Sequence, residues 1–202
     1  MTPLAAHVGY ALAWASFGAV HSLLAREFVK ARLRPALGST YRLAYNGLSA
    51  LHLAAVWALG RGVFAGGTAL ALPGWAQSGQ VAVEAIGWGL MIAALGGYDL
   101  GRLGGLRQIR NRRRGIVEAE EEPLRRDGLH RFVRHPVYAA GILILWGRIG
   151  SELDLATALW GSLYLIVGAH FEERWLTAHY GAAYADYRKR VPAFVPWRGR
   201  AI

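Results

Sequence analysis

The chain contains no cysteine among its 202 residues. Disulfide bonds and thiolate metal sites are therefore excluded. Charged residues are also scarce, at 18%, whereas hydrophobic residues make up 54% and the mean hydropathy is +0.23. This balance is unusual for a soluble domain, and the apolar residues come in blocks, which indicates a membrane protein.

Acidic residues are the scarcer of the two charged classes. The chain has 13 Asp and Glu against 23 Lys and Arg, which gives a formal net charge of +10. Such an excess attracts either nucleic acid or an anionic membrane surface. The basic residues lie between the apolar blocks, so their distribution follows a membrane topology and argues against nucleic-acid binding.

Five apolar stretches are candidates for membrane-spanning helices. A spanning helix needs roughly 20 mostly apolar residues. The sequence predicts spans at 8–25, 43–60, 81–98, 137–147 and 155–171. The fourth is short, and we expect it to pair with the fifth as a helical hairpin that turns near 150–154. Ala, Gly and Ser are frequent in these stretches, which suits close helix packing in lipid.

The basic residues also predict an orientation. All of the 23 Lys and Arg except Arg61 and Arg148 fall on one side of the five-span arrangement. Loops rich in Lys and Arg face the cytoplasm. We therefore expect an integral protein of the inner (cytoplasmic) membrane, with its N-terminus outside and its C-terminus inside.

The expected fold is an all-α polytopic membrane bundle that forms one domain over residues 1–202. It comprises a three-helix part at 1–98, a cytoplasmic loop at 99–136, the hairpin at 137–171 and a cytoplasmic tail at 172–202. Apolar and aromatic residues recur at steps of three and four over 172–190. This spacing predicts an amphipathic C-terminal helix on the cytoplasmic side, interrupted at Gly181.

Two polar clusters flank the hairpin. Arg134, His135 and Tyr138 surround Pro136, which is tolerated in a first helical turn. Glu172 and Glu173 follow the second arm, so antiparallel arms would bring both clusters to one membrane face. Carboxylates suit an ammonium group, Arg or His a carboxylate, and Tyr a sulfonium or a ring. The alternative is a plain interfacial belt of charged and aromatic residues.

The segment from about 124 to 197 resembles the integral-membrane methyltransferases that include isoprenylcysteine carboxyl methyltransferases and phospholipid methyltransferases. The matching residues are Arg134-His135-Pro136-Val137-Tyr138, Gly141, Glu172-Glu173, Leu176, Tyr180-Gly181, Tyr184, Tyr187, Arg190-Val191-Pro192 and Pro196. The resemblance implies S-adenosylmethionine bound between the loop, the hairpin and a covering tail at 172–202. It implies cofactor contacts for His135, Tyr138 and Glu173, with Glu172 and Arg134 as neighbours.

Two departures from the family pattern bear on the site. Many relatives have an aromatic residue where this chain has His130, so we place His130 in the cofactor site as its replacement. The prenylcysteine enzymes carry an Arg shortly before the Glu pair, thought to face the substrate carboxylate. Gly168, Ala169 and His170 occupy that stretch here, which disfavours carboxyl methylation.

The N-terminal half resembles the methanethiol S-methyltransferase branch at 21–25, 41–46 and 99–108. The resemblance implies a small or lipid-soluble acceptor, with a thiol foremost. A Cys-like thiol has a pKa of about 8.5, so it benefits from a base or a positive field. We expect His170 or His21 to act as that base. Arg42 or Arg134 would supply the field. Alternatively, His170 only caps the hairpin or binds Glu173.

Three other functions remain open from the sequence. They are carboxyl methylation of a prenylcysteine-like substrate, NADPH-dependent reduction on a similar membrane hairpin, and a non-catalytic membrane factor on the same scaffold. We expect membrane lipid as a partner and no bound metal, and the sequence leaves the oligomeric state open.

Overall fold

The computed structural model describes residues 2–67, 69–116 and 123–197, and these contain helices and no strand. The chain divides into two compact units. Unit 1 comprises Met1–Gly66 with Tyr98–Glu122, and unit 2 comprises Gly67–Gly97 with Pro123–Ile202. The third predicted span therefore groups with the hairpin in unit 2, and the single domain over 1–202 stays a prediction.

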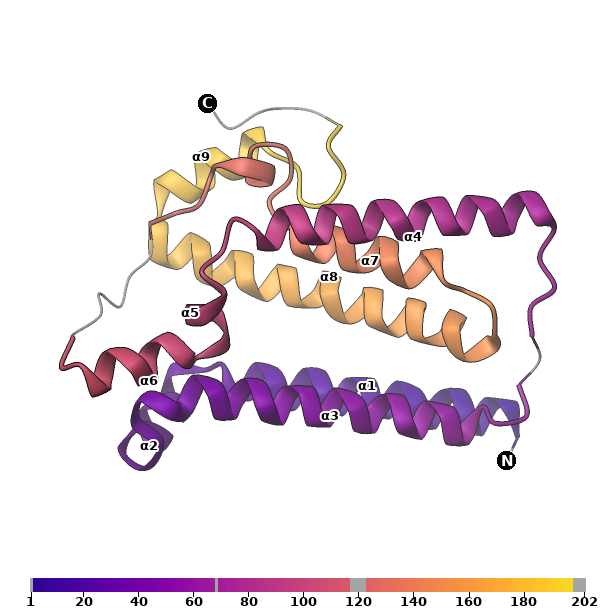
Figure 1. Ribbon diagram of the computed structural model, residues 1–202, viewed down its shortest axis with the longest axis horizontal. Coiled ribbons are helices and arrows are strands. Elements are labelled where there is room, and N and C mark those ends of the chain that lie inside the picture. Colours follow the sequence, from indigo (N-terminus) through magenta and orange to yellow (C-terminus); the bar gives the residue numbers. More distant parts are fainter. Residues whose placement is uncertain (1, 68, 117–122, 198–202) are drawn as a thin grey trace. The chain divides into compact units, whose positions relative to one another are not determined.

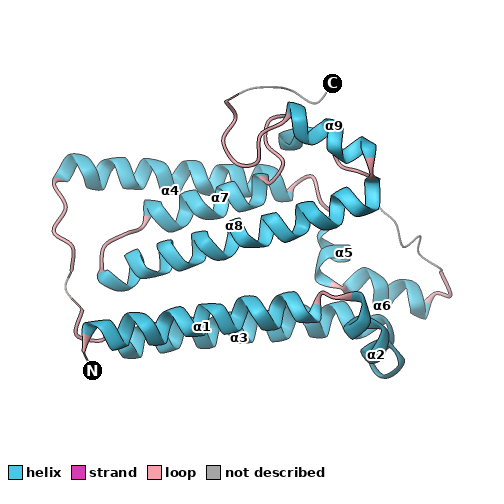
Figure 2. Ribbon diagram, turned by 180° about the vertical axis from the view of Figure 1, so that it is seen from behind, coloured by secondary structure: helices cyan, strands magenta, loops and turns pink. Residues whose placement is uncertain are grey.

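Unit 1 is built on two long helices that run side by side (Figures 1 and 2). Its elements are α1 (Pro3–Leu24), α2 (Glu27–Leu37), the 3-10 turn η1 (Gly38–Thr40), α3 (Tyr41–Val63), α5 (Leu100–Gly104) and α6 (Leu106–Arg113). Gly105 joins α5 to α6 with a φ of 93°, a conformation that favours glycine. A Cβ atom at Gly105 would lie 2.6 Å from the Leu43 nitrogen, so glycine also permits the close approach to α3.

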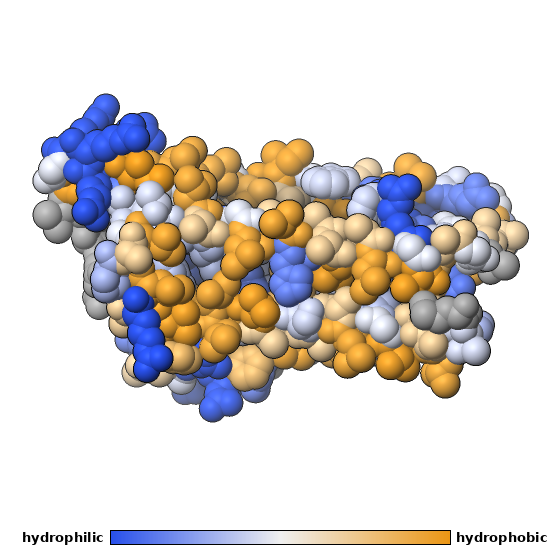
Figure 3. All heavy atoms as spheres, turned by 90° about the horizontal axis from the view of Figure 1, so that it is seen from below, coloured by the Kyte–Doolittle hydropathy of each residue, from blue (hydrophilic) through white to orange (hydrophobic). Residues whose placement is uncertain are grey.

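The surface of unit 1 is strongly apolar along α3. Leu51 and Trp57 expose 69% and 51% of their surface. Figure 3 shows hydrophobic residues over much of the face seen from below. Strongly hydrophilic residues gather toward the end where Figure 1 places α2 and α6. Large exposed apolar surfaces are uncommon on soluble monomers, whereas lipid solvates them readily.

Unit 2 consists of three helices side by side, with a short helix at one end (Figures 1 and 2). Its elements are α4 (Gly74–Leu95), the 3-10 turn η2 (Gly128–Arg131), α7 (Pro136–Gly147), α8 (Glu152–Tyr180) and α9 (Ala182–Arg190). A Cβ at Gly87 would lie 2.9 Å from the Ile144 nitrogen, and one at Gly147 would overlap the Glu84 backbone. These glycines allow the α4 and α7 backbones to touch, as in many membrane helix pairs.

The turn between α7 and α8 is held by polar side chains. Asp154 Oδ2 accepts a hydrogen bond of 3.1 Å from the Gly150 N–H. The Leu70 N–H donates to the Gly150 carbonyl at 3.0 Å. Gln80 Nε2 donates to the Ile149 carbonyl at 2.9 Å. These backbone groups at the turn are therefore paired within unit 2.

Three helical segments are long and apolar enough to cross a membrane: Glu27–Val63, Gly74–Leu95 and Glu152–Tyr180. They contain the spans predicted at 43–60 and 155–171 and most of the one at 81–98. The spans predicted at 8–25 and 137–147 fall largely on α1, which has 22 residues, and on the shorter apolar helix α7. A membrane protein is therefore supported, and the count of five spans stays a prediction.

The C-terminal region differs from the predicted boundary. We expected a separate helix to begin at 172, whereas α8 continues without a break to Tyr180. The chain becomes polar after Phe171, but no residue there breaks a helix, so polarity alone does not end it. The break comes at Gly181, whose φ of 56° terminates α8 before α9 begins. An amphipathic, cytoplasmic role for α9 stays a prediction.

Candidate functional site

The hairpin of unit 2 brings the two polar clusters together. Arg134 and His135 immediately precede α7, and Glu173 lies near the end of α8. Arg134 Nε and Nη2 lie 2.8 and 2.5 Å from Glu173 Oε1. His135 Nε2 lies 3.1 Å from the same oxygen. Groups 38 and 39 residues apart in sequence therefore share one carboxylate.

The two neighbouring glutamates have different surroundings. Glu173 is 7% exposed and contacts basic side chains through both oxygens. The side chain of Glu172 is 44% exposed, and its Oε2 lies 3.6 Å from His135 Nδ1. Successive residues on a helix point about 100° apart, which separates the two carboxylates. Glu172 is thus the carboxylate of the pair that remains open to a ligand.

Aromatic rings lie beside the Glu172 carboxylate, and we call the surface formed by Glu172, His135, Tyr138 and Phe194 the mouth. The rings of His135 and Tyr138 stack with a centroid distance of 5.4 Å and an angle of 8°. Phe194 from the C-terminal tail lies 5.6 Å from the His135 ring on centroid distance. Tyr138 is also within hydrogen-bonding reach of the Glu172 carboxylate. A half-open carboxylate therefore stands beside an aromatic surface.

The neighbours of His135 favour its charged form. Burial of the ring is the largest single influence and lowers its pKa, but the hydrogen bonds and charges of Glu172 and Glu173 together outweigh it. The pKa of His135 is therefore raised above its ordinary value of 6.5. An opposite charge close by stabilises the protonated ring, which in turn keeps the two carboxylates ionised.

His130 connects the loop to α9. Its Nδ1 lies 3.1 Å from the Arg134 carbonyl, and its own carbonyl accepts a 2.7 Å hydrogen bond from the Tyr187 hydroxyl. Burial lowers the pKa of the His130 ring, which favours the neutral form that can donate to the Arg134 carbonyl. The structure shows His130 in a supporting position, and its contact with a cofactor stays a prediction.

Arg188 is a member of the cluster that sequence reasoning missed. Its Nε lies 3.2 Å from Glu173 Oε2. It follows Tyr187 directly and lies one helical turn after Tyr184 on α9, and both tyrosines are buried in a small core with Val191. Its position near Tyr184 and Tyr187 was the one sequence feature that could have indicated a place in the cluster. A basic residue on a polar helix more often faces solvent.

His170 is exposed on α8. Its ring contacts Phe171 edge-on at 5.9 Å. The buried side of α8 runs through Ala158, Ser162, Ala169 and Glu173, at steps of four and seven. His170 lies about 100° around the helix from Ala169, outside that stripe. The structure thus does not place His170 in the buried cluster around Glu173, and its role as a base stays a prediction.

His21 belongs to a polar cluster inside unit 1. Its Nδ1 lies 3.0 Å from Ser49 Oγ, and its Nε2 lies 2.7 Å from the Tyr45 hydroxyl. The Ser49 hydroxyl donates its hydrogen to the Tyr45 carbonyl at 2.8 Å. Ser49 Oγ is therefore placed to accept from His21 Nδ1. These contacts hold the His21 ring between α1 and α3.

Arg42 ties the start of α3 to α5. Its Nε donates to the Leu103 carbonyl at 3.1 Å, and Asn46 Nδ2 donates to the same oxygen at 2.8 Å. Both residues belong to the sequence segment 41–46 that resembles the thiol branch of the family. Within unit 1, both side chains therefore hold the α5 backbone against the start of α3, and Arg42 is exposed.

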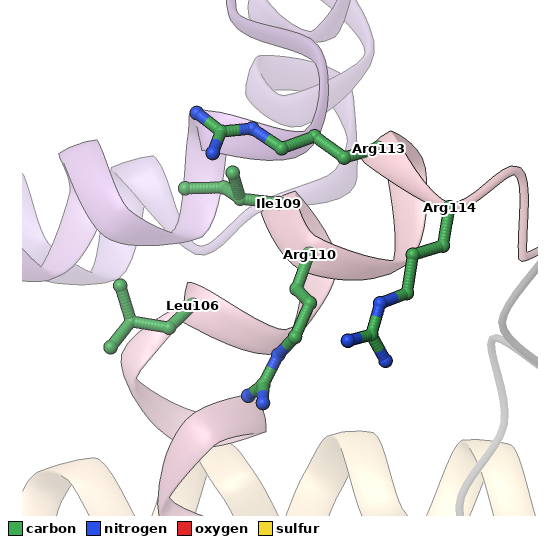
Figure 4. Close-up of a pocket in the computed structure, with 5 residues that line it drawn as sticks. All are labelled: Leu106, Ile109, Arg110, Arg113 and Arg114. Atoms are coloured by element: carbon green, nitrogen blue, oxygen red, sulfur yellow. The ribbon is translucent and has the colours of Figure 1, made fainter.

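A shallow hollow lies along α6 and contains none of the predicted site residues. Figure 4 shows the residues that line it: Leu106, Ile109, Arg110, Arg113 and Arg114. These side chains come from one short helix and the residue after it, so they surround an open surface. Among the described residues, no group of three His, Asp or Glu side chains is arranged to hold a metal ion.

Comparison with known proteins identifies relatives that are named methyltransferases. Methanethiol S-methyltransferase 2 of Bradyrhizobium diazoefficiens is 37% identical over 130 residues, which cover 61% of this chain and 50% of the relative. Methanethiol S-methyltransferase of Pseudomonas sp. (strain GM41(2012)) is 28% identical over 186 residues, which cover 91% and 71%. No family model matches the chain, and no solved structure matches it significantly.

A further relative is named for a different methyl acceptor. Protein-S-isoprenylcysteine O-methyltransferase of Schizosaccharomyces pombe is 34% identical over 76 residues, which cover 35% of this chain and 31% of the relative. The chain matches half or less of the length of the two Bradyrhizobium relatives. All of these names are methyltransferases, and the described helices include three suited to a membrane. The chain is therefore similar, over the matched residues, to methyltransferases named for methanethiol and for protein-S-isoprenylcysteine.

Proposed function

We propose that the protein transfers a methyl group from S-adenosylmethionine to a small or lipid-soluble thiol. The observation that carries this proposal is the half-open Glu172 carboxylate beside the stacked His135 and Tyr138 rings. The relatives named methanethiol S-methyltransferase support the reaction class and the thiol.

The donor set fits the proposed cofactor. S-adenosylmethionine carries an ammonium, a carboxylate, ribose hydroxyls and a sulfonium. Glu172 offers a carboxylate to the ammonium or the hydroxyls, and Tyr138 offers an electron-rich ring to the sulfonium. Three nitrogens of Arg134 and both Glu173 oxygens already have protein partners. Both ring nitrogens of His135 also have carboxylate partners. We therefore assign direct cofactor contact to Glu172 and Tyr138, with His135, Arg134, Glu173 and His130 supporting them.

When bound, S-adenosylmethionine supplies an electrophilic methyl group for in-line displacement. The protein then has mainly to orient the acceptor, which is worth roughly 7–11 kcal/mol in favourable cases. A thiol acceptor must also lose its proton. An imidazole nitrogen takes up that proton from the S–H group, and His21 or His170 is the proposed base. Arg42 or Arg134 supplies a positive field that favours the thiolate.

His21 and His170 both stay candidates for the proposed base. Within unit 1, the His21 ring contacts the Ser49 and Tyr45 hydroxyls, and within unit 2, His170 is exposed on α8.

We further propose the inner membrane as the location, with the N-terminus outside and the cofactor site on the cytoplasmic side. The distribution of Lys and Arg supports this orientation.

Titration calorimetry on the detergent-purified protein tests the cofactor. We expect S-adenosylmethionine and S-adenosylhomocysteine to bind, and Glu172→Gln to weaken both. Glu152→Gln, at the opposite end of the same helix, is the matched control and should bind normally. Binding of NADPH alone would instead support a reductase, and no binding of any nucleotide would support a non-catalytic factor.

Methyl transfer from labelled S-adenosylmethionine then tests the acceptor. The panel comprises methanethiol, longer alkyl thiols, a prenylcysteine and a lipid amine. We expect transfer to thiols and a loss of rate in His21→Gln with cofactor binding retained. Transfer to the prenylcysteine carboxyl group alone would overturn the thiol proposal.

A further inference from the structure

The Glu173 carboxylate joins three separate segments of unit 2. From α8, its Oε1 accepts from Arg134 Nη2 at 2.5 Å and contacts His135 Nε2 at 3.1 Å, and both of these partners lie in the loop before α7. Its Oε2 lies 3.2 Å from Arg188 Nε on α9. A carboxylate has about four lone-pair positions, so these contacts use most of its capacity.

Further hydrogen bonds from Arg134 and His135 attach the C-terminal tail to the loop. Arg134 Nη1 donates to the carbonyl of Arg188 at 3.2 Å and also to that of Val191. The backbone N–H groups of Arg134 and His135 donate to the carbonyls of Pro192 and Ala193 at 2.9 and 3.0 Å. This arrangement sets the next residue of the tail, Phe194, against the His135 ring.

Arg188 is the solvent-exposed member of the junction, by which we mean the contacts that join Glu173, the loop at 134–135 and the tail. Its side chain is 55% exposed, whereas those of Arg134 and Glu173 are each 10% exposed. A partly exposed partner can be removed with water filling its place, so its loss should loosen the junction without unfolding the helices. Removal of a fully buried partner would instead leave an uncompensated charge.

We propose that Arg188 is a positioning residue, which acts through Glu173 to hold His135 and the tail segment 191–194 in place. The tail then forms one wall of the mouth that contains Glu172 and Tyr138. Loss of Arg188 frees Glu173 Oε2, allows the carboxylate to rotate and weakens the contacts that orient His135. The part of this inference that concerns the cofactor rests on the proposed function.

The absence of cysteine allows a direct test of the tail. A nitroxide spin label on Val195→Cys, a position 65% exposed at the end of the segment, reports tail mobility by electron paramagnetic resonance. We expect Arg188→Gln to increase that mobility and to weaken S-adenosylhomocysteine binding about tenfold, which corresponds to about 1.4 kcal/mol. Arg188→Lys should restore part of both effects because its ammonium can still pair with Glu173.

Lys189→Gln is the matched control, because Lys189 is adjacent on α9 and pairs with Asp186 instead. It should change neither tail mobility nor binding. In a Glu173→Gln background, Arg188→Gln should add much less than it does alone, because the partner through which it acts is already neutral. Full additivity of the two substitutions would overturn the pathway through Glu173.

The outcomes separate this inference from the proposed function. A tail that is as rigid in Arg188→Gln as in the unchanged protein overturns the positioning role, whatever binds. A mobile tail in a protein that never binds S-adenosylhomocysteine supports the fastening and removes the proposed cofactor. A mobile tail with unchanged binding shows that the tail is not a wall of the site, and this also overturns the proposal.

Discussion

The two units build their polar clusters from different chemistry. In unit 2, the ionised Glu173 carboxylate pairs with Arg134, Arg188 and His135. In unit 1, His21, Tyr45 and Ser49 form a chain of hydrogen bonds between two helices. The first cluster joins three segments and the second joins two neighbouring helices.

This difference follows the cost of charge in lipid. Ionised side chains are expensive at membrane depth, whereas neutral hydrogen-bonded groups are tolerated there. The charged cluster lies at the end of the hairpin, where the loop and tail provide partners. The His21 cluster joins the last turn of α1 to the first turns of α3 through hydrogen bonds alone.

The largest expected effect comes from Glu173→Gln. The substitution leaves Arg134 buried without its anion, and loss of one partner of a buried ion pair costs roughly 3–5 kcal/mol. Thermal unfolding in detergent, followed by circular dichroism, should show a clearly lowered midpoint. Asp186→Asn removes an exposed carboxylate from α9 and serves as the control, with a nearly unchanged midpoint.

An intermediate effect is expected from pH through His135. Because its pKa is raised in the folded protein, its contribution to stability is complete below 6.5, the ordinary value, and is lost as pH rises through the folded pKa. The free energy of unfolding should therefore fall as pH increases above about 6.5, and His135→Gln should flatten this dependence. A stability that rises with pH in this window, and does so only when His135 is present, would contradict the ion pairing.

The smallest effect is expected from Tyr45→Phe in unit 1. It removes one neutral hydrogen bond, and such bonds between membrane helices contribute about 0.6 kcal/mol on average. The unfolding midpoint should drop only slightly, and Ser49→Ala should behave similarly. A destabilisation equal to that of Glu173→Gln would show that the two clusters do not differ in the way proposed.

Much of the helical architecture can be predicted from local patterns. Apolar blocks locate α3 and α8 and most of α4, while Pro136 correctly marks the start of α7 and Gly181 the end of α8. The predicted boundary at Phe171 followed the change in polarity. Because no helix-breaking residue occurs there, α8 continues to Tyr180. The polarity of a segment indicates whether it lies in lipid or in water, whereas residues such as Gly and Pro determine where a helix ends.

The cluster itself could be predicted only in part. The hairpin places Arg134 and His135 beside the Glu pair, as expected from antiparallel arms. Nothing local distinguishes Glu173 from Glu172, because the phase of α8 relative to the loop decides which one is buried. The Arg188 contact also depends on how α9 folds back after Gly181, and this is a tertiary property.

The short helix α7 has a consequence for the depth of the mouth. Its 12 residues rise only about 18 Å, against a hydrocarbon layer of about 30 Å. If α7 crosses the membrane as predicted, one of its ends is therefore recessed below the lipid headgroups. The turn at Ile149 and Gly150 can be submerged, since Asp154, Gln80 and Leu70 pair with its backbone groups. If instead the Pro136 end is recessed, the bilayer thins around it, and the proposed lipid-soluble thiol could enter from the acyl chains.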